Sequence, residues 1–204
     1  MPTLLHVDSS PRVASVSSKL AAAFVRRWQR RNPTGTVIHH NTTLERIPYI
    51  DEAHIAAACT PAEKLTPDEK EKLAYSDKLV DELLAADVVV LGVPMWGLGI
   101  PASLKAWIDM VVRAGRTFAL TEDGVRPLIP GGKKVYVISA RGGSYPAGTP
   151  AKALDQQDPY LRTILGVLGL TDLEFIYAEN QGRGDAAAAE GVAKAETILA
   201  QLTA

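Results

Sequence analysis

The sequence predicts an α/β fold: a doubly wound, five-stranded parallel sheet in the order 2-1-3-4-5, with helices on both faces. Short apolar or β-branched runs alternate along the 204 residues with segments of helical spacing, which is typical of successive βαβ units. The third run, 87–93, shows no polar alternation, as expected for a central parallel strand covered on both sides. Because parallel crossovers are right-handed, few strand orders remain, and we expect this one.

Five strands and five helices account for most of the chain. The strands are predicted from β-rich apolar runs at 3–7, 36–40, 87–93, 134–139 and 173–177. The helices are predicted from apolar residues spaced three or four apart at 17–31, 67–86, 101–115, 159–168 and 185–202. The clearest helix start is Thr66, which suits an N-cap and is followed by Pro67 and by Glu69, as in a capping box.

Two segments fall outside this alternation. Asp123 and Gly124 lie between two short apolar runs and predict a small hairpin inserted near 117–128. The segment 44–65 is expected to be irregular. No low-complexity tract or linker divides the chain, so we expect residues 1–204 to form a single domain.

Composition excludes several classes of protein. Hydrophobic residues make up 47% and charged residues 22% of the chain, which excludes a mainly disordered one. The 22 basic and 23 acidic residues give a net charge of -1, so we expect no binding to nucleic acid. Pro94 and Pro101 interrupt the uncharged stretch 88–104, so we expect no membrane span there. Cys59 is the single cysteine and no internal disulfide is possible, which makes the reducing cytoplasm the expected location.

We expect a ligand to bind beyond the carboxyl ends of the first, third and fourth strands, because the strand order reverses there. Three loops meet at this position: 8–17, 94–101 and 139–148. The first carries five serines within 9–18 and leads into a helix, so its hydroxyl and N–H groups suit a phosphate monoester. Ordinary N-capping by Ser15 or Ser17 is the alternative.

The second and third loops offer contacts for a flat ring. Met95, Trp96 and Leu98 are apolar neighbours of glycines that let a ligand approach the backbone. The adjacent Gly142 and Gly143 would present N–H groups to an acceptor such as a ring carbonyl.

Other features are less specific. Arg141 has two open interpretations, a positive charge at the site or a solvated side chain. The stretch 97–102 fits the G-x-G-x-x-A pattern of nicotinamide-binding folds, but it follows the third strand instead of the first. His39 and His40 alternate across a strand, and no His, Cys and carboxylate cluster has ligand spacing, so we expect no metal. No motif for a nucleophile is present, so we assign no catalytic residue.

Taken in their order along the chain, the motifs resemble those of the FMN-dependent NADH-azoreductases, which are flavodoxin-like quinone reductases. Ser9-Ser10 together with Ser15-Val16-Ser17 is similar to their phosphate loop. Pro94-Met95-Trp96-Gly97-Leu98 is similar to their Pro-Met-Tyr-Asn-Phe motif, and Arg141-Gly142-Gly143 to their Ser-Arg-Gly-Gly motif. The cofactor-binding residues that this resemblance implies are Ser10, Ser15, Val16, Ser17, Met95, Trp96, Gly97, Leu98, Ala140, Arg141, Gly142 and Gly143. The chain departs from the family at 96–98, so Gly97 could bond to a flavin only through its backbone.

The resemblance implies an enzyme with noncovalently bound FMN, reduced by NADH or NADPH and reoxidised by quinones or azo compounds in ping-pong fashion. Hydride moves directly to a flavin, which fits the lack of acid and base residues in the three loops. The resemblance also implies a homodimer, in which Trp107, Tyr160 and Leu161 belong either to an apolar surface or to the core. Two alternatives stay open: a flavodoxin-type electron carrier, which the net charge of -1 disfavours, and a dehydrogenase that uses 97–102.

Overall fold

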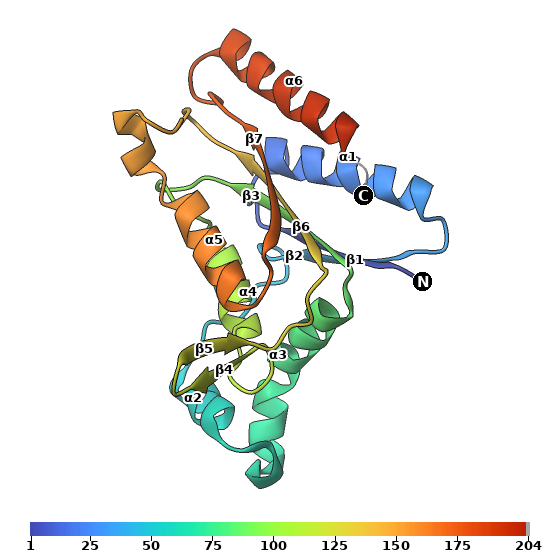
Figure 1. Cartoon of the computed structure of the whole chain (residues 1–204), viewed down its shortest axis with the longest axis vertical. Helices are drawn as coiled ribbons and strands as arrows, with labels where there is room; N and C mark the ends of the chain where they lie inside the picture. Colours follow the sequence, from blue (N-terminus) through green and yellow to red (C-terminus); the bar gives the residue numbers. More distant parts are fainter. Residues whose placement is uncertain (203–204) are drawn as a thin grey trace.

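Five parallel strands form the central sheet of the computed structural model, which describes residues 1–202 (Figure 1). They are β1 (Thr3–Asp8), β2 (Thr36–Asn41), β3 (Val88–Pro94), β6 (Lys134–Ala140) and β7 (Asp172–Ala178). Their order is β2-β1-β3-β6-β7. Since β6 and β7 are the fourth and fifth strands of this sheet, the predicted order 2-1-3-4-5 is confirmed. The central strand β3 pairs Val89 with Leu5 of β1 and with Val135 of β6.

Helices cover both faces of the sheet (Figure 1). On one face lie α1 (Val16–Arg31) and α6 (Asp185–Gln201), and on the other lie α3 (Pro67–Ala85), α4 (Ala102–Val111) and α5 (Gln157–Val167). Successive β3 residues alternate between these layers: Val89 and Leu91 pack with α3, α4 and α5, and Val90 packs with α1 and α6. A strand buried on both sides has no solvent face, which explains the absence of polar alternation in its sequence.

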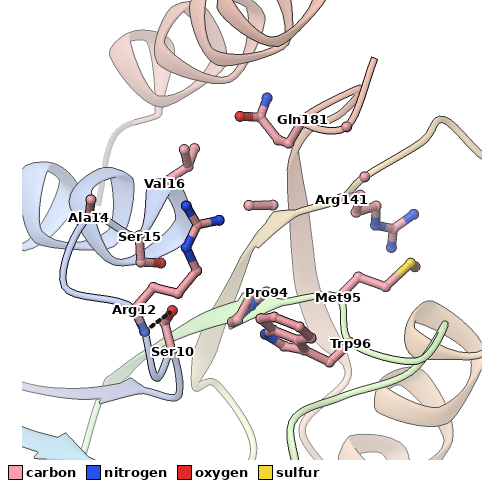
Figure 2. A pocket seen from close by; sticks show the side chains of 13 residues that line it. Ser10, Arg12, Ala14, Ser15, Val16, Pro94, Met95, Trp96, Arg141 and Gln181 are labelled. Carbon is pink, nitrogen blue, oxygen red and sulfur yellow. Dashed lines mark hydrogen bonds between the residues drawn. The ribbon is translucent and has the colours of Figure 1, made fainter. Parts of the chain in front are cut away.

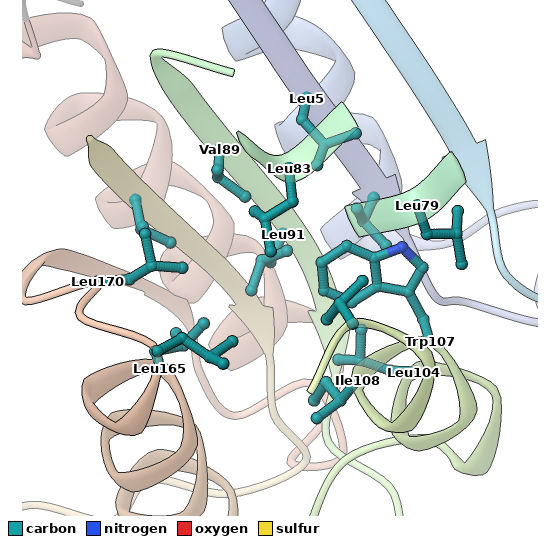
Figure 3. Packing of buried hydrophobic residues seen from close by; sticks show 14 of the residues in the cluster. Leu5, Leu79, Leu83, Val89, Leu91, Leu104, Trp107, Ile108, Leu165 and Leu170 are labelled. Carbon is teal, nitrogen blue, oxygen red and sulfur yellow. The ribbon is translucent and has the colours of Figure 1, made fainter. Parts of the chain in front are cut away.

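The larger core layer surrounds the indole of Trp107, which lies close to Leu79 and Leu83 of α3 (Figure 3). Trp107 is 2% exposed and Leu161 is 0% exposed, while Tyr160 is partly buried against the same cluster. The core alternative is therefore confirmed for Trp107 and Leu161, and the interpretation as an apolar surface is wrong for these two residues. Because Trp107 and Leu161 pack toward the sheet, the apolar faces of α4 and α5 that carry them are already buried within one chain.

The segment 44–65 is more regular than predicted. It contains α2 (Glu52–Cys59) and a 3-10 turn (Ala62–Lys64), which raises the number of α-helices described from the expected five to six. Asp51 is the N-cap of α2 and accepts a hydrogen bond of 2.8 Å from the His54 N–H. An Asp followed by a short alanine-rich segment is a helix start that the sequence already contained.

The helix expected over 101–115 ends earlier, at Val111. Thr117 explains the early end, because its hydroxyl donates to the Val111 carbonyl at 2.8 Å and accepts from the Arg113 N–H at 2.9 Å. The side chain thus takes the place of the next helical turn. A second 3-10 turn that was not predicted spans Pro150–Leu154.

The antiparallel strands β4 (Phe118–Thr121) and β5 (Gly124–Pro127) form a hairpin at the predicted position, outside the main sheet. Gly124 has a φ of 116°, a value that a residue without a side chain adopts easily. Within residues 1–202, no helix is both long enough and apolar enough to span a membrane.

Candidate functional site

A cavity of about 330 Å³ opens at the carboxyl ends of β1, β3 and β6, where the strand order reverses (Figure 2). Eight of the twelve predicted site residues line it: Ser10, Ser15, Val16, Met95, Trp96, Ala140, Arg141 and Gly142. The other four belong to the same loops without lining the cavity: Ser17, Gly97, Leu98 and Gly143. The topological rule thus located the cavity from the strand order alone.

The sequence reasoning missed five residues that line the cavity: Arg12, Ala14, Pro94, Gln181 and Gly182. Three of them belong to loops that were already considered. The other two follow β7, a strand whose carboxyl end lies beside that of β6. A usable signal was present, because 181–184 reads Gln-Gly-Arg-Gly directly after a predicted strand.

The N-terminus of α1 provides the anion-binding groups of the cavity. Ser15 is the N-cap, and its Oγ accepts from the Ser18 N–H at 3.2 Å. The N–H groups of Val16 and Ser17 have no acceptor inside the helix, as at every helix N-terminus. Ser15 therefore caps the helix, as the alternative interpretation expected, and it also lines the cavity.

Ser17 lies behind Ser15 as seen from the cavity lining. The residue is 0% exposed, and its Oγ lies 3.1 Å from the Ser15 Oγ. A hydroxyl in this position can orient the Ser15 hydroxyl. Only the backbone N–H of Ser17 belongs to the free end of the helix.

The loop between β1 and α1 is fixed to the sheet at several points. Ser9 donates to the Gly92 carbonyl from both its N–H (3.0 Å) and its Oγ (2.8 Å). The Asp8 carboxylate accepts from the Ser18 Oγ at 2.8 Å and from the Ser10 N–H at 3.3 Å. Arg12 is exposed on this loop, and its guanidinium extends toward the cavity (Figure 2).

The loop after β3 is a tight turn that presents the indole of Trp96. The N–H of Trp96 donates to the Gly99 carbonyl at 3.1 Å, and the N–H of Gly99 donates back at 2.9 Å. Gly97 and Leu98 have φ values of 53° and 67°, as in the two central residues of a type I′ turn. The turn directs these two residues away from the cavity and leaves Trp96 51% exposed at its edge. The 97–102 pattern follows β3, not β1, so its glycines form this turn and not a dinucleotide loop.

The loop after β6 is paired with the loop after β7. The Arg141 carbonyl accepts from the Gln181 N–H at 2.9 Å, and the Gly142 carbonyl accepts from the Gly182 N–H at 3.0 Å. These bonds use the carbonyl groups, and the N–H groups of Gly142 and Gly143 make no hydrogen bond to any residue within 1–202. A Cβ on Gly142 would meet nothing within 4 Å, so the backbone here is open to a ligand. This arrangement fits the predicted presentation of N–H groups to an acceptor.

The Arg141 side chain is neither solvated nor free to supply charge to a ligand. It is 2% exposed, and its Nη1 lies 3.2 Å from Asp155 Oδ2. Its guanidinium lies 4.0 Å from the centre of the Tyr177 ring and points away from the cavity (Figure 2). The solvated interpretation is therefore wrong, and the positive charge lies at the edge of the cavity, paired with a buried carboxylate from the segment before α5.

The ionisable groups beneath the cavity are held in fixed protonation states. Burial opposes ionisation of Asp155, but the Asp158 N–H, Lys152 and Arg141 outweigh it and hold the pKa of Asp155 below its usual range. Burial and the hydrogen bond to Asp158 raise the pKa of Tyr177. The carboxylate thus stays charged and the phenol neutral near pH 7. This pattern is that of a structural network and not of an acid–base pair tuned to pH 7.

The geometry defines the class first: a doubly wound α/β protein whose switch point holds a cavity between a helix N-terminus and an exposed indole. A model of the flavodoxin-like fold family matches residues 2–202. The chain is 46% identical to an FMN-dependent NADH:quinone oxidoreductase of a Nostoc species, over 100% of this chain and 99% of that one. A protein of the same name from Leptothrix cholodnii is also 46% identical, over 98% of this chain and 95% of that one.

A solved structure agrees with the sequence relatives. The azoreductase from Bacillus anthracis strain Sterne superimposes with a TM-score of 0.86 at 31% identity, covering 99% of this chain and 100% of that one. This chain belongs to the family of FMN-dependent NADH:quinone oxidoreductases, within the flavodoxin-like fold.

Proposed function

We propose that the protein is an FMN-dependent oxidoreductase that uses NADH to reduce quinones by two electrons and to cleave azo compounds reductively. The observation that carries this proposal is the cavity that joins a helix N-terminus to an exposed indole and to the unpaired N–H of Gly142, with Gly143 next to it in the same loop. The names of the relatives and of the similar structure support the same activity, and they support NADH as the donor in preference to NADPH.

The residues present fit FMN. A phosphate needs N–H donors, hydroxyls and positive charge, and the free end of α1, Ser15 and Arg12 supply them at one side of the cavity. A flat ring needs an apolar wall, which Met95 and Trp96 supply. The cavity volume of about 330 Å³ falls in the range of small-molecule sites, and its open side leaves one ring face accessible.

The protein positions its reactants and does not itself exchange protons with them. FMN, when bound, supplies the hydride-accepting and electron-donating chemistry. The N–H groups of Gly142 and Gly143 would hold ring carbonyl oxygens, and the Trp96 indole would border the face that donor and acceptor visit in turn. In the overall reaction, NADH, one proton and a quinone give NAD⁺ and a hydroquinone. Solvent supplies the proton through the open side of the cavity.

The flavodoxin-type electron carrier is the weaker candidate. Such carriers present a strongly acidic face to their partners, whereas this chain has a net charge of -1. Its relatives carry enzyme names over the full length of the chain.

We also propose that the protein is a single-domain homodimer in the cytoplasm. Leu120 and Val125 of the β4–β5 hairpin are 74% and 50% exposed, and an isolated two-stranded ribbon gains stability when a partner covers its apolar side chains. The reduced thiol of Cys59 supports a cytoplasmic location.

The first prediction concerns the phosphate end of the cavity. Ser15→Ala removes a hydroxyl that would bond a charged phosphate, and such a bond contributes about 1.5–3 kcal/mol, so FMN affinity should fall about ten- to hundredfold. Ser17→Ala should reduce it less, because Ser17 acts through Ser15. Titration of the apoprotein with FMN measures both.

The matched control is Thr66→Ala, which removes the N-cap of α3 instead. Both N-cap variants should lose about 1 kcal/mol of unfolding free energy, but only Ser15→Ala should bind FMN more weakly. Equal FMN affinity in Ser15→Ala and wild type would contradict the placement of the phosphate.

The second prediction concerns the activity. The purified protein should be yellow, should lose its activity when FMN is removed, and should regain it when FMN is added back. With NADH and a benzoquinone or an azo dye it should turn over continuously, and double-reciprocal plots at several acceptor concentrations should be parallel, since the two substrates share one site. A yellow protein that does not oxidise NADH would indicate the electron carrier, and a colourless active one the dehydrogenase.

The third prediction concerns assembly. Sedimentation at micromolar concentration should give a mass near twice 21.8 kDa. Leu120→Asp should shift the mass toward one chain, because a charge is costly in an apolar interface. Leu44→Asp, at a side chain that is 78% exposed outside the hairpin, is the control and should leave the mass unchanged. The proposal fails if the wild type is a monomer that still turns over.

A further inference from the structure

The cavity continues along the surface beyond Trp96. The indole also borders a neighbouring hollow of about 310 Å³, whose lining includes Thr43 and Ser103. These two residues in turn border a third hollow, of about 390 Å³, that includes Arg46 and Tyr49. The three hollows share Trp96 and then Thr43 and Ser103 as lining residues, so they follow one another from the site to the segment between β2 and α2. We call the surface defined by Trp96, Thr43, Ser103, Arg46 and Tyr49 the groove.

The far end of this groove has the chemistry of an anion site. Thr42 donates a hydrogen bond of 3.0 Å to the Ser103 Oγ, and the Thr43 Oγ1 lies 3.4 Å from the same atom, so three hydroxyls gather there. Arg46 is exposed beside them. A guanidinium with hydroxyl groups around it suits phosphate oxygens.

Arg46 differs from the arginines that stabilise the fold through ion pairs. The arginines with ion pairs among residues 1–202 are Arg113, Arg116, Arg141 and Arg162. Arg46 makes no such pair, as is true of seven other arginines, but it is the arginine among residues 1–202 with a positive φ, and its φ of 51° places a bulky residue in the left-handed region. Strain of this kind concentrates at functional positions.

The last feature of the groove is an exposed aromatic ring. Tyr49 lines the same hollow as Arg46 and is 75% exposed. An open phenol ring next to a cationic site offers a stacking surface for a base.

We propose that this groove binds the dinucleotide part of NADH, with its pyrophosphate at Arg46, Thr43 and Ser103 and its adenine against Tyr49. This inference rests on the proposed function, because it assumes that the nicotinamide ring meets the flavin beside Trp96. The rest of NADH must then leave the cavity along the surface, and the neighbouring hollows lead from Trp96 to Arg46, a cation without a carboxylate partner. With a net charge of -1, the chain as a whole offers no attraction for a dianion, so a local cation has to supply it.

The test isolates the donor. FMN-loaded protein is mixed with NADH without any acceptor, and the loss of flavin absorbance against NADH concentration gives a limiting rate and a Kd. The variant is Arg46→Asn, because asparagine is neutral and adopts the left-handed region readily. Arg46→Lys is the conservative variant, and Arg30→Asn, at an exposed arginine near the far end of α1, is the charge control. The second probe is 1-benzyl-1,4-dihydronicotinamide, which lacks ribose, phosphate and adenine.

Arg46→Asn should raise the Kd for NADH at least about tenfold and leave the limiting rate within about twofold, because a charge-assisted contact is lost far from the reacting atoms. Arg46→Lys should recover part of the affinity, and Arg30→Asn should behave as wild type. None of the variants should change the reaction with the benzyl compound.

Three results would overturn the inference. The first is an unchanged Kd for NADH in Arg46→Asn, and the second is an equal loss with the benzyl compound. The third is a particular form of the first: Arg46→Asn leaves the Kd for NADH unchanged but raises the KM for a sulfonated azo acceptor and not the KM for benzoquinone. That result would assign the groove to the acceptor. Failure of the proposed function looks different, because wild type itself would then show no NADH-driven loss of flavin absorbance.

Discussion

The close approach of α1 to β3 is the constraint on which the site depends. Gly92 fits this approach, because a Cβ there would be tight against Asp8 Oδ1 at 3.3 Å and in contact with the Ala21 Cβ of α1 at 3.4 Å. With this contact in place, the Gly92 carbonyl receives both donors of Ser9, and Asp8 receives the hydroxyl of Ser18. The free N–H groups at the start of α1 are thereby held at the carboxyl edge of the sheet, where the strand order reverses.

The buried charged side chains hold the loops at the carboxyl edge of the sheet in place, and we assign them no part in the redox reaction. The buried pair of Arg141 and Asp155 ties the loop after β6 to the segment before α5, and removing either partner would leave an uncompensated buried charge. The site itself consists of hydroxyls, backbone N–H groups, apolar walls and the exposed guanidinium of Arg12. Such a site can bind and orient a redox cofactor, which fits a reaction in which hydride moves directly between bound rings.

Much of this organisation could be predicted from the sequence. Unbroken apolar runs identified the buried strands, and the strand order then located the cavity before any side chain was considered. The position of the hairpin followed from Asp123 and Gly124, and the capping box of α3 is formed as predicted. These features depend on local patterns and on rules of chain connection, which the sequence contains.

The remaining features depend on contacts between distant residues. The burial of Arg141 required Asp155 and Tyr177 to be placed beside it, and the burial of Trp107 required the packing of α4 on the sheet. The turn at 96–99 directs Gly97 and Leu98 away from the cavity, which depends on φ values that only Gly97 suggested in advance. α2 was overlooked because its short alanine-rich segment has no amphipathic pattern, although Asp51 marked its start.

The central claim is that the N-terminus of α1 recognises the phosphate of the cofactor. The most direct measurement compares the Kd values of FMN and riboflavin for the apoprotein under the same conditions, because the two ligands share the ring and the ribityl chain and differ in the phosphate. Two or more charge-assisted hydrogen bonds at about 1.5–3 kcal/mol each predict that FMN binds at least about a hundredfold more tightly. Equal affinities for the two ligands would contradict the claim, since the flavin would then be held without the helix terminus.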